Sequence, residues 1–88
     1  MNAIAVSMRA RLAALEPAHL DIRDDSARHA GHVGAHQGGS HFTMTIVSRH
    51  FAGKRMTERH RMVYDALGTL MKRDIHALSI DAKTPEET

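Results

Sequence analysis

The stretch that decides the fold is His41-Phe42-Thr43-Met44-Thr45-Ile46-Val47-Ser48. Large apolar side chains recur there at every second position, which is typical of a strand with one buried face. The intervening threonines are also common in strands. This pattern predicts a strand over 41–48 that turns Phe42, Met44 and Ile46 toward the core.

The residues that follow predict a second strand beside the first. A basic turn over 49–56, which contains Phe51 and Gly53, leads to a helix that we expect to begin at a Thr57 cap and end near Arg73. The buried stripe of this helix consists of Val63, Ala66, Leu67, Leu70 and Met71. A strand over 75–82 then carries His76, Leu78 and Ile80 at one parity. A strand–helix–strand crossover within one sheet makes the two strands parallel.

The residues upstream predict a helix and an edge strand. Ile4, Met8, Leu12 and Leu15 share one side of a helix that begins with Asn2 as a cap and ends before Pro17. The alternation over 19–25 predicts a half-buried strand, antiparallel to 41–48. We therefore expect a single α/β (α+β) domain over 1–88, with two helices on one face of a three-stranded mixed sheet. Its ordered core would span 2–83, and the polar tail 84–88 would be frayed.

Composition excludes several classes of function. The 88 residues include no cysteine, which rules out disulfides, thiol nucleophiles and a cluster held by this chain's own thiolates. No apolar run approaches the roughly 18 to 20 residues of a membrane span. We also find no nucleophile–base pair, nucleotide-binding motif or carboxylate pair. We therefore expect a cytoplasmic protein that is not an enzyme and has no membrane partner or small-molecule substrate.

The segment 27–40 is unusual for so short a chain. Its 14 residues join two predicted strands, and loops of that length are usually functional or disordered. It contains His29, His32 and His36, whose spacing of three and four would align them for zinc or nickel on a helix. Gly31 and Gly34 argue against a helix there. From the loop alone we expect only weak, adventitious metal binding.

Positive charge is concentrated between Arg49 and Arg61. The net charge of the chain is +2, but this segment alone has a balance of +4, with Glu58 opposing Arg49, Lys54, Arg55, Arg59 and Arg61. Such a patch is either a solvated face or a surface for phosphate or an acidic partner. His60 falls near the apolar arc of the same helix, where we expect it to be partly buried and structural.

The chain resembles the BolA family. The resemblance rests on short motifs in family order, which cover nearly the whole chain: Asp24-Asp25-Ser26-Ala27-Arg28-His29, Ser40-His41-Phe42, Ile46-Val47-Ser48, Phe51-Ala52-Gly53, Arg59-His60-Arg61-Met62-Val63-Tyr64, Ile75-His76-Ala77-Leu78-Ser79 and Thr84-Pro85-Glu86-Glu87. It implies a fold like the second type of KH domain.

The resemblance also implies a function. BolA-like proteins form heterodimers with monothiol glutaredoxins in iron–sulfur and iron homeostasis. By position in the family, His29 and His76 would be ligands of a bridging [2Fe–2S] cluster, with His32 and His36 as alternates for His29. The resemblance supplies the remaining ligands from the glutaredoxin thiolate and glutathione, so we expect no cluster on the isolated chain. Without the resemblance, His76 would be interpreted as a hydrogen-bonded histidine at a strand edge.

The alternative function is that of a DNA-binding transcriptional regulator of stress response and cell morphology. KH domains hold nucleic-acid backbones with a glycine-bearing loop that leads into a helix, and here Gly53-Lys54-Arg55 precedes one. The candidate surface consists of Lys54, Arg55, Arg59 and Arg61, which would meet either DNA or a protein partner. The GXXG pattern is missing, however, and the sheet offers no aromatic platform for bases.

Overall fold

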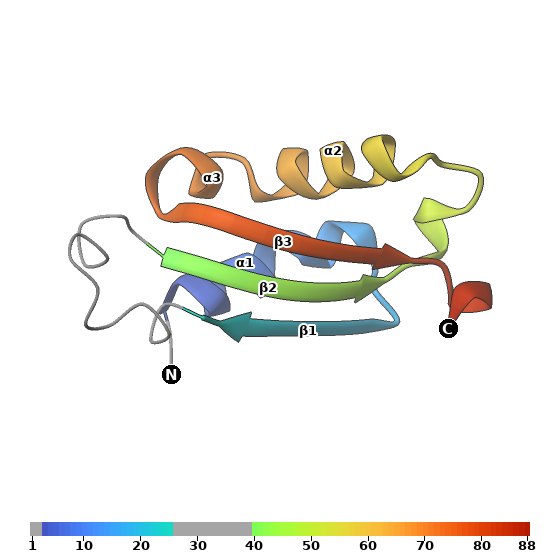
Figure 1. Ribbon diagram of the computed structural model, residues 1–88, viewed down its shortest axis with the longest axis horizontal. Helices are drawn as coiled ribbons and strands as arrows, with labels where there is room; N and C mark the ends of the chain where they lie inside the picture. The colour runs from blue at the N-terminus through green and yellow to red at the C-terminus, as the bar shows by residue number, and fades with distance from the viewer. Residues whose placement is uncertain (1–2, 26–39) are drawn as a thin grey trace.

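The computed structural model describes residues 3–25 and 40–88, and all structural statements below concern these residues. Figure 1 shows a three-stranded sheet with helices packed on one face. In chain order the elements are α1 (Ala3–Leu12), η1 (Ala13–Leu15), β1 (His19–Asp24), β2 (Ser40–Val47), η4 (Arg49–Phe51), α2 (Met56–Leu67), α3 (Leu70–Arg73), β3 (Ile75–Lys83) and η5 (Pro85–Glu87).

The first helix follows its predicted stripe. Met8 and Leu12 are fully buried, and Ile4 and Leu15 pack against the core from its margin. The last turn tightens into η1, and Glu16 then adopts a left-handed conformation with φ of 49°. Since proline disfavours the α conformation in the residue before it, Pro17 accounts for the end of the helix. The predicted cap Asn2 lies outside the described residues.

The sheet has the predicted topology, with strand order β1-β2-β3. β2 lies in the centre, antiparallel to β1 and parallel to β3. The register places Met44 opposite Ile22 on one side and Ile80 on the other. These residues therefore lie on one face of the sheet, where Phe42, Met44 and Ile46 are buried against α1 and α2. The fold class predicted from the alternation is confirmed.

The long helix predicted over 57–73 is wrong in two respects. It begins at Met56 rather than after a Thr57 cap, because the Glu58 side chain accepts a hydrogen bond (2.9 Å) from the backbone N–H of Arg55. It also breaks after Leu67, where Gly68 has φ of 56° and ψ of −128°, a conformation that only glycine adopts readily. The chain resumes as the single turn α3, and Leu70 still reaches the core.

The C-terminal residues are structured, contrary to the expectation of a frayed tail. β3 extends to Lys83, Thr84 is buried, and Pro85–Glu87 form the turn η5. The Glu87 carboxylate accepts a hydrogen bond from the Thr84 backbone N–H at 2.7 Å and forms an ion pair with Arg59 on α2. A polar sequence is thus held in place by a side chain 28 positions away.

Candidate functional site

His76 is the extra residue in an irregularity of the parallel pairing. Ser40 pairs with Ile75, and the next residue of β2, His41, pairs with Ala77. His76 therefore has no pairing partner on β2, as in a β-bulge. Ile75 remains in the core at 4% exposure, whereas the His76 side chain is exposed. The predicted sharing of one face with Leu78 and Ile80 is therefore wrong, because the bulge interrupts the alternation.

The bulge brings His76 next to a second imidazole, that of His41. The two ring centroids are 5.1 Å apart, and the ring planes are inclined by 42°. His41 lies on the central strand and is half-buried. Its side chain alternates with that of the buried Phe42, so it belongs to the face of the sheet that the helices do not cover.

Sequence reasoning missed His41 as a candidate ligand. Ser40-His41-Phe42 was recognised only as a family motif, because nothing in the sequence gives the pairing register between β2 and β3. The signal that would have found it is the combination of parallel pairing with a histidine at the start of each strand.

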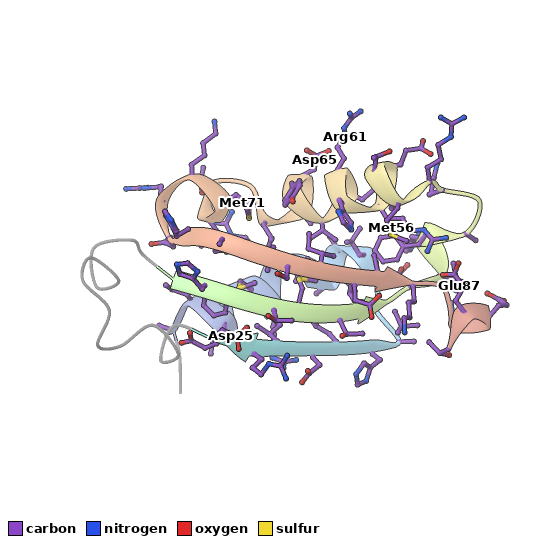
Figure 2. The ribbon with its side chains drawn as sticks, in the orientation of Figure 1. Asp25, Met56, Arg61, Asp65, Met71 and Glu87 are labelled. Carbon is purple, nitrogen blue, oxygen red and sulfur yellow. The ribbon has the colours of Figure 1, made fainter. Side chains whose placement is uncertain are left out.

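The histidine-rich segment attaches to the sheet at the same end. His29, His32 and His36 lie outside the described residues, so their prediction as ligands is not tested. The residues that flank this segment are described. The Asp25 N–H donates to the His41 carbonyl at 2.8 Å, and Ser40 pairs with Ile75 beside His76. Asp25 is labelled at this end of β1 in Figure 2.

Within the described ranges, no group of three or more histidine, cysteine, aspartate or glutamate side chains could hold a metal ion. His41 and His76 are therefore two possible metal ligands, and the described residues add no third histidine or carboxylate to form a ligand group with them. Any cluster or multiply ligated metal at this end would need further ligands from the segment 26–39 or from another molecule.

The basic turn lies at the other end of the strands, after β2. Phe51 is buried and fixes η4 against the core, and the Lys54 N–H donates to the Phe51 carbonyl at 3.0 Å. Gly53 has φ of 76°, which lets the chain reverse toward α2. Lys54, Arg55 and Arg61 are exposed, and Figure 2 shows Arg61 on α2 pointing away from the sheet. These three cations form the accessible part of the predicted surface.

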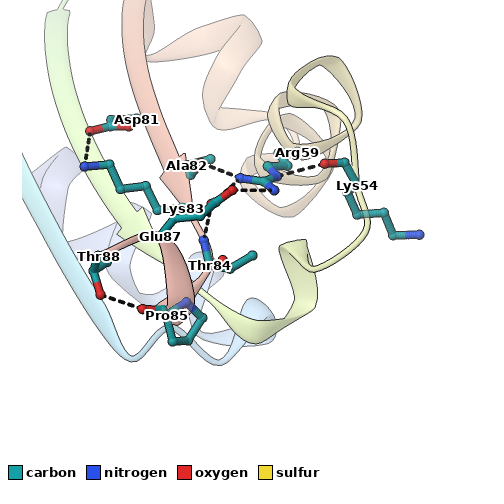
Figure 3. Close-up of polar contacts among 9 residues, drawn as sticks. All are labelled: Lys54, Arg59, Asp81, Ala82, Lys83, Thr84, Pro85, Glu87 and Thr88. Carbon is teal, nitrogen blue, oxygen red and sulfur yellow. Dashed lines mark hydrogen bonds and ion pairs between the residues drawn. The ribbon is translucent and has the colours of Figure 1, made fainter.

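The prediction that Arg59 belongs to that surface is wrong. Arg59 is only 7% exposed, because its guanidinium lies between the basic turn, the end of β3 and η5 (Figure 3). It donates to the carbonyls of Lys54 and Ala82, both at 3.0 Å, and to both Glu87 oxygens at 2.7 and 3.2 Å. The hydrogen bonds from Arg59 to Glu87, together with the bond from the Thr84 N–H, lower the pKa of Glu87 to about 2. Helical spacing alone did not reveal that this arginine faces inward.

His60 lies half-buried on α2, as expected. Its Nε2 is shielded from solvent and has no hydrogen-bond partner among the described residues. This ring therefore contributes packing, and it is remote in the chain from the His41–His76 pair.

A comparison with protein-family models matches residues 12–87 to the BolA-like protein family. The chain belongs to the BolA family. The match includes the sheet, the bulge that carries His76 and the basic turn.

Relatives and solved structures of the BolA family agree with this assignment. The chain is 45% identical over 78 residues to SufE-like protein 1 and 44% identical over 77 residues to BOLA1, both of Arabidopsis thaliana. These alignments cover 83% and 84% of this chain but only 21% and 48% of those relatives, so the chain spans at most about half the length of either. The structure of the BolA domain of SufE1 superposes over all of this chain and 99% of that domain, with a TM-score of 0.86 and 42% identity.

A bacterial relative carries a functional name. The DNA-binding transcriptional regulator BolA of Escherichia coli is 37% identical over 75 residues, which covers 85% of this chain and 69% of that protein. Other BolA-family relatives, such as that of Mus musculus, are named only as BolA-like proteins. Among the described residues of this chain, no helix has the length and apolarity needed to cross a membrane.

Proposed function

We propose that this BolA-family chain is a non-catalytic partner of a monothiol glutaredoxin and contributes histidine ligands to a bridging [2Fe–2S] cluster in iron–sulfur and iron homeostasis. The observation that carries the proposal is the exposed His76 on the β3 bulge, at the end of the sheet where the histidine-rich segment begins and ends. The residues on either side of His76 pair with β2, and its exposed imidazole is accessible to a second protein.

The donor chemistry of the chain fits such a shared site. The chain has histidines but no cysteine, so it can offer neutral nitrogen ligands and no thiolates. His76 would be one ligand and His29 the other, with His32 and His36 as alternates, while the glutaredoxin and glutathione would supply sulfur. Imidazole in place of thiolate raises the reduction potential of a [2Fe–2S] cluster, as in Rieske-type centres. The role of this chain is to present these nitrogens, and we propose that it does so in the cytoplasm.

The test is a titration of cluster-loaded monothiol glutaredoxin with this protein, followed by visible absorption and circular dichroism. The wild type should produce a new, saturable spectrum, and His76→Ala should not. His19→Ala is a matched control, because His19 is an exposed strand histidine that pairs with Val47 at the opposite end of the sheet. Spectra that stay unchanged with the wild type would refute the proposal.

DNA binding is a second candidate, favoured by the name of the E. coli relative and by the exposed Lys54, Arg55 and Arg61. The similarity of the turn to a KH-type backbone clamp remains a prediction. Three cations without an aromatic platform would give salt-sensitive contacts with phosphates and little base selectivity. Fluorescence anisotropy with a labelled duplex at several salt concentrations tests this candidate. An affinity that does not change when Lys54 and Arg55 are both replaced by alanine would exclude the basic turn as the DNA-binding surface.

A further inference from the structure

The pair formed by His41 and His76 has a geometry that cluster sharing does not require. The family resemblance assigned the cluster to His76 and to a histidine of the segment 26–39, and His41 had no role in it. The structure nevertheless places the His41 ring centroid 5.1 Å from that of His76. The two rings lie at the start of adjacent parallel strands, one exposed and one half-buried.

This separation matches two imidazoles bound to one metal ion. With a metal–nitrogen distance of about 2.0 to 2.1 Å and a ring radius of about 1.1 Å, two imidazoles at the tetrahedral angle have centroids about 5 Å apart. An edge-to-face aromatic contact allows a similar distance. The two explanations differ in what they require, because only metal binding needs the ring nitrogens.

The backbone fixes both histidines before any ligand arrives. His41 lies on the central strand, where it pairs with Ala77 and its carbonyl accepts the Asp25 N–H. His76 is held between Ile75 and Ala77, both of which are in register with β2. A site on paired strands loses little conformational entropy when it binds.

We propose that His41 and His76 form a binding site for a single divalent transition-metal ion on the isolated chain, with solvent completing the coordination. Imidazole suits Zn²⁺, Ni²⁺ and Cu²⁺, and among the described residues no third histidine or carboxylate joins this pair as a possible ligand group. The site shares His76 with the proposed cluster. It needs no glutaredoxin and makes His41 a ligand.

Zn²⁺ is the probe for the test, because it is diamagnetic and leaves every histidine visible by NMR. The experiment titrates the full chain with zinc at about pH 7.5, where a neutral imidazole keeps one N–H and offers its other nitrogen to a metal. Ring nitrogen resonances are followed by long-range ¹H–¹⁵N correlation. We expect the signals of His41 and His76 to shift together and to saturate at one equivalent. Those of His19 and His50, two exposed histidines elsewhere, should not follow.

Two phenylalanine variants separate metal binding from aromatic packing. His41→Phe and His76→Phe each keep a ring at the pair but remove its nitrogens, so each should retain the fold and lose the saturable shift of the other histidine. If the shift persists in either variant, the rings are only an aromatic contact and the proposal fails.

A third variant tests the segment 26–39 as the competing site. Replacing His29, His32 and His36 together with alanine should leave the zinc response of His41 and His76 intact. Loss of that response in this variant would assign zinc to the segment and overturn the proposal. Because the titration uses the chain without glutaredoxin, its failure would leave the cluster-sharing proposal untouched.

Discussion

Arg59 shows how one side chain can hold three segments together. Its guanidinium donates to the carbonyl of Lys54 in the basic turn, to that of Ala82 in β3 and to the carboxylate of Glu87 in η5. A planar group with five N–H donors suits this arrangement, and a lysine could not reproduce it. The residue predicted to extend a binding surface is therefore a structural support of that surface.

Replacing Arg59 should therefore destabilise the fold. Arg59→Ala removes the guanidinium that donates to two carbonyls and to the Glu87 carboxylate, and we expect a loss of about 2 kcal/mol in the free energy of unfolding. Arg61→Ala, on the exposed side of the same helix, should change it by no more than about 0.5 kcal/mol. Urea unfolding followed by circular dichroism measures both. Equal stabilities of the two variants would contradict the role assigned to Arg59.

The ion pair between Arg59 and Glu87 makes the stability of the fold sensitive to acid. Its pKa is about 2 in the folded chain, mainly because Arg59 donates to it, against an ordinary value of 4.5. The unfolded chain therefore binds a proton more readily between these values, so the stabilisation is complete above about pH 4.5 and is lost as the pH falls toward 2. Glu87→Gln should be less stable than the wild type near neutral pH. Its stability should also fall less than that of the wild type as the pH decreases from about 4.5 toward 2. Thermal melts across that range provide the measurement, and parallel curves for the two proteins would contradict it.

At the scale of elements, the break between α2 and α3 depends on one glycine. Gly68 has a positive φ, and a Cβ added there would lie 3.1 Å from Nη1 of Arg11, which donates to the Leu67 carbonyl. The flexible guanidinium can move aside, so backbone strain is the main cost. We expect Gly68→Ala to lower stability by about 1 to 3 kcal/mol. Thr69→Ala, an exposed neighbour, is the control, and equal urea midpoints for the two variants would show that the conformation is not strained.

The elements that sequence predicted well are those in which a regular pattern determines burial. The alternation of Phe42, Met44 and Ile46 gave the core face, and the stripe through Met8 and Leu12 gave the first helix. The break at Gly68 was missed because Leu67 and Leu70, on either side of it, both reach the core and preserve an apparent helical stripe. An apolar period records which residues are buried, and it does not record the backbone path between them.

The candidate site was predictable only in part, for a related reason. His76 was found through its family motif, but its exposure comes from a bulge, which arises between strands and has no signature within either one. His41 and Arg59 were misjudged because their partners, His76 and Glu87, are distant in the chain. Long-range pairing determines whether such side chains face solvent, a ligand or each other.

At the scale of the whole molecule, the two candidate surfaces lie at opposite ends of the sheet. His76 lies beside the first residue of β2, and the basic turn follows the last one (Figure 1). The eight residues of β2 separate them by about 23 Å at the usual strand rise of about 3.3 Å per residue. That distance exceeds the Debye length of about 8 Å at physiological salt, so charge at one end has little influence on the other.

This separation predicts that the two proposed activities can be removed independently. Replacing both Lys54 and Arg55 with alanine should weaken DNA binding and reduce the slope of log K against log salt by about 1.8, since each phosphate contact contributes about 0.9. The same variant should still produce the new glutaredoxin-dependent cluster spectrum. His76→Ala should do the reverse, losing the spectrum and keeping the DNA affinity and its salt slope. Anisotropy and visible circular dichroism on the same preparations provide both readouts. If either variant removed both activities, the two surfaces would act as one. The inference that cluster sharing and DNA binding use independent surfaces at opposite ends of the sheet would then be wrong.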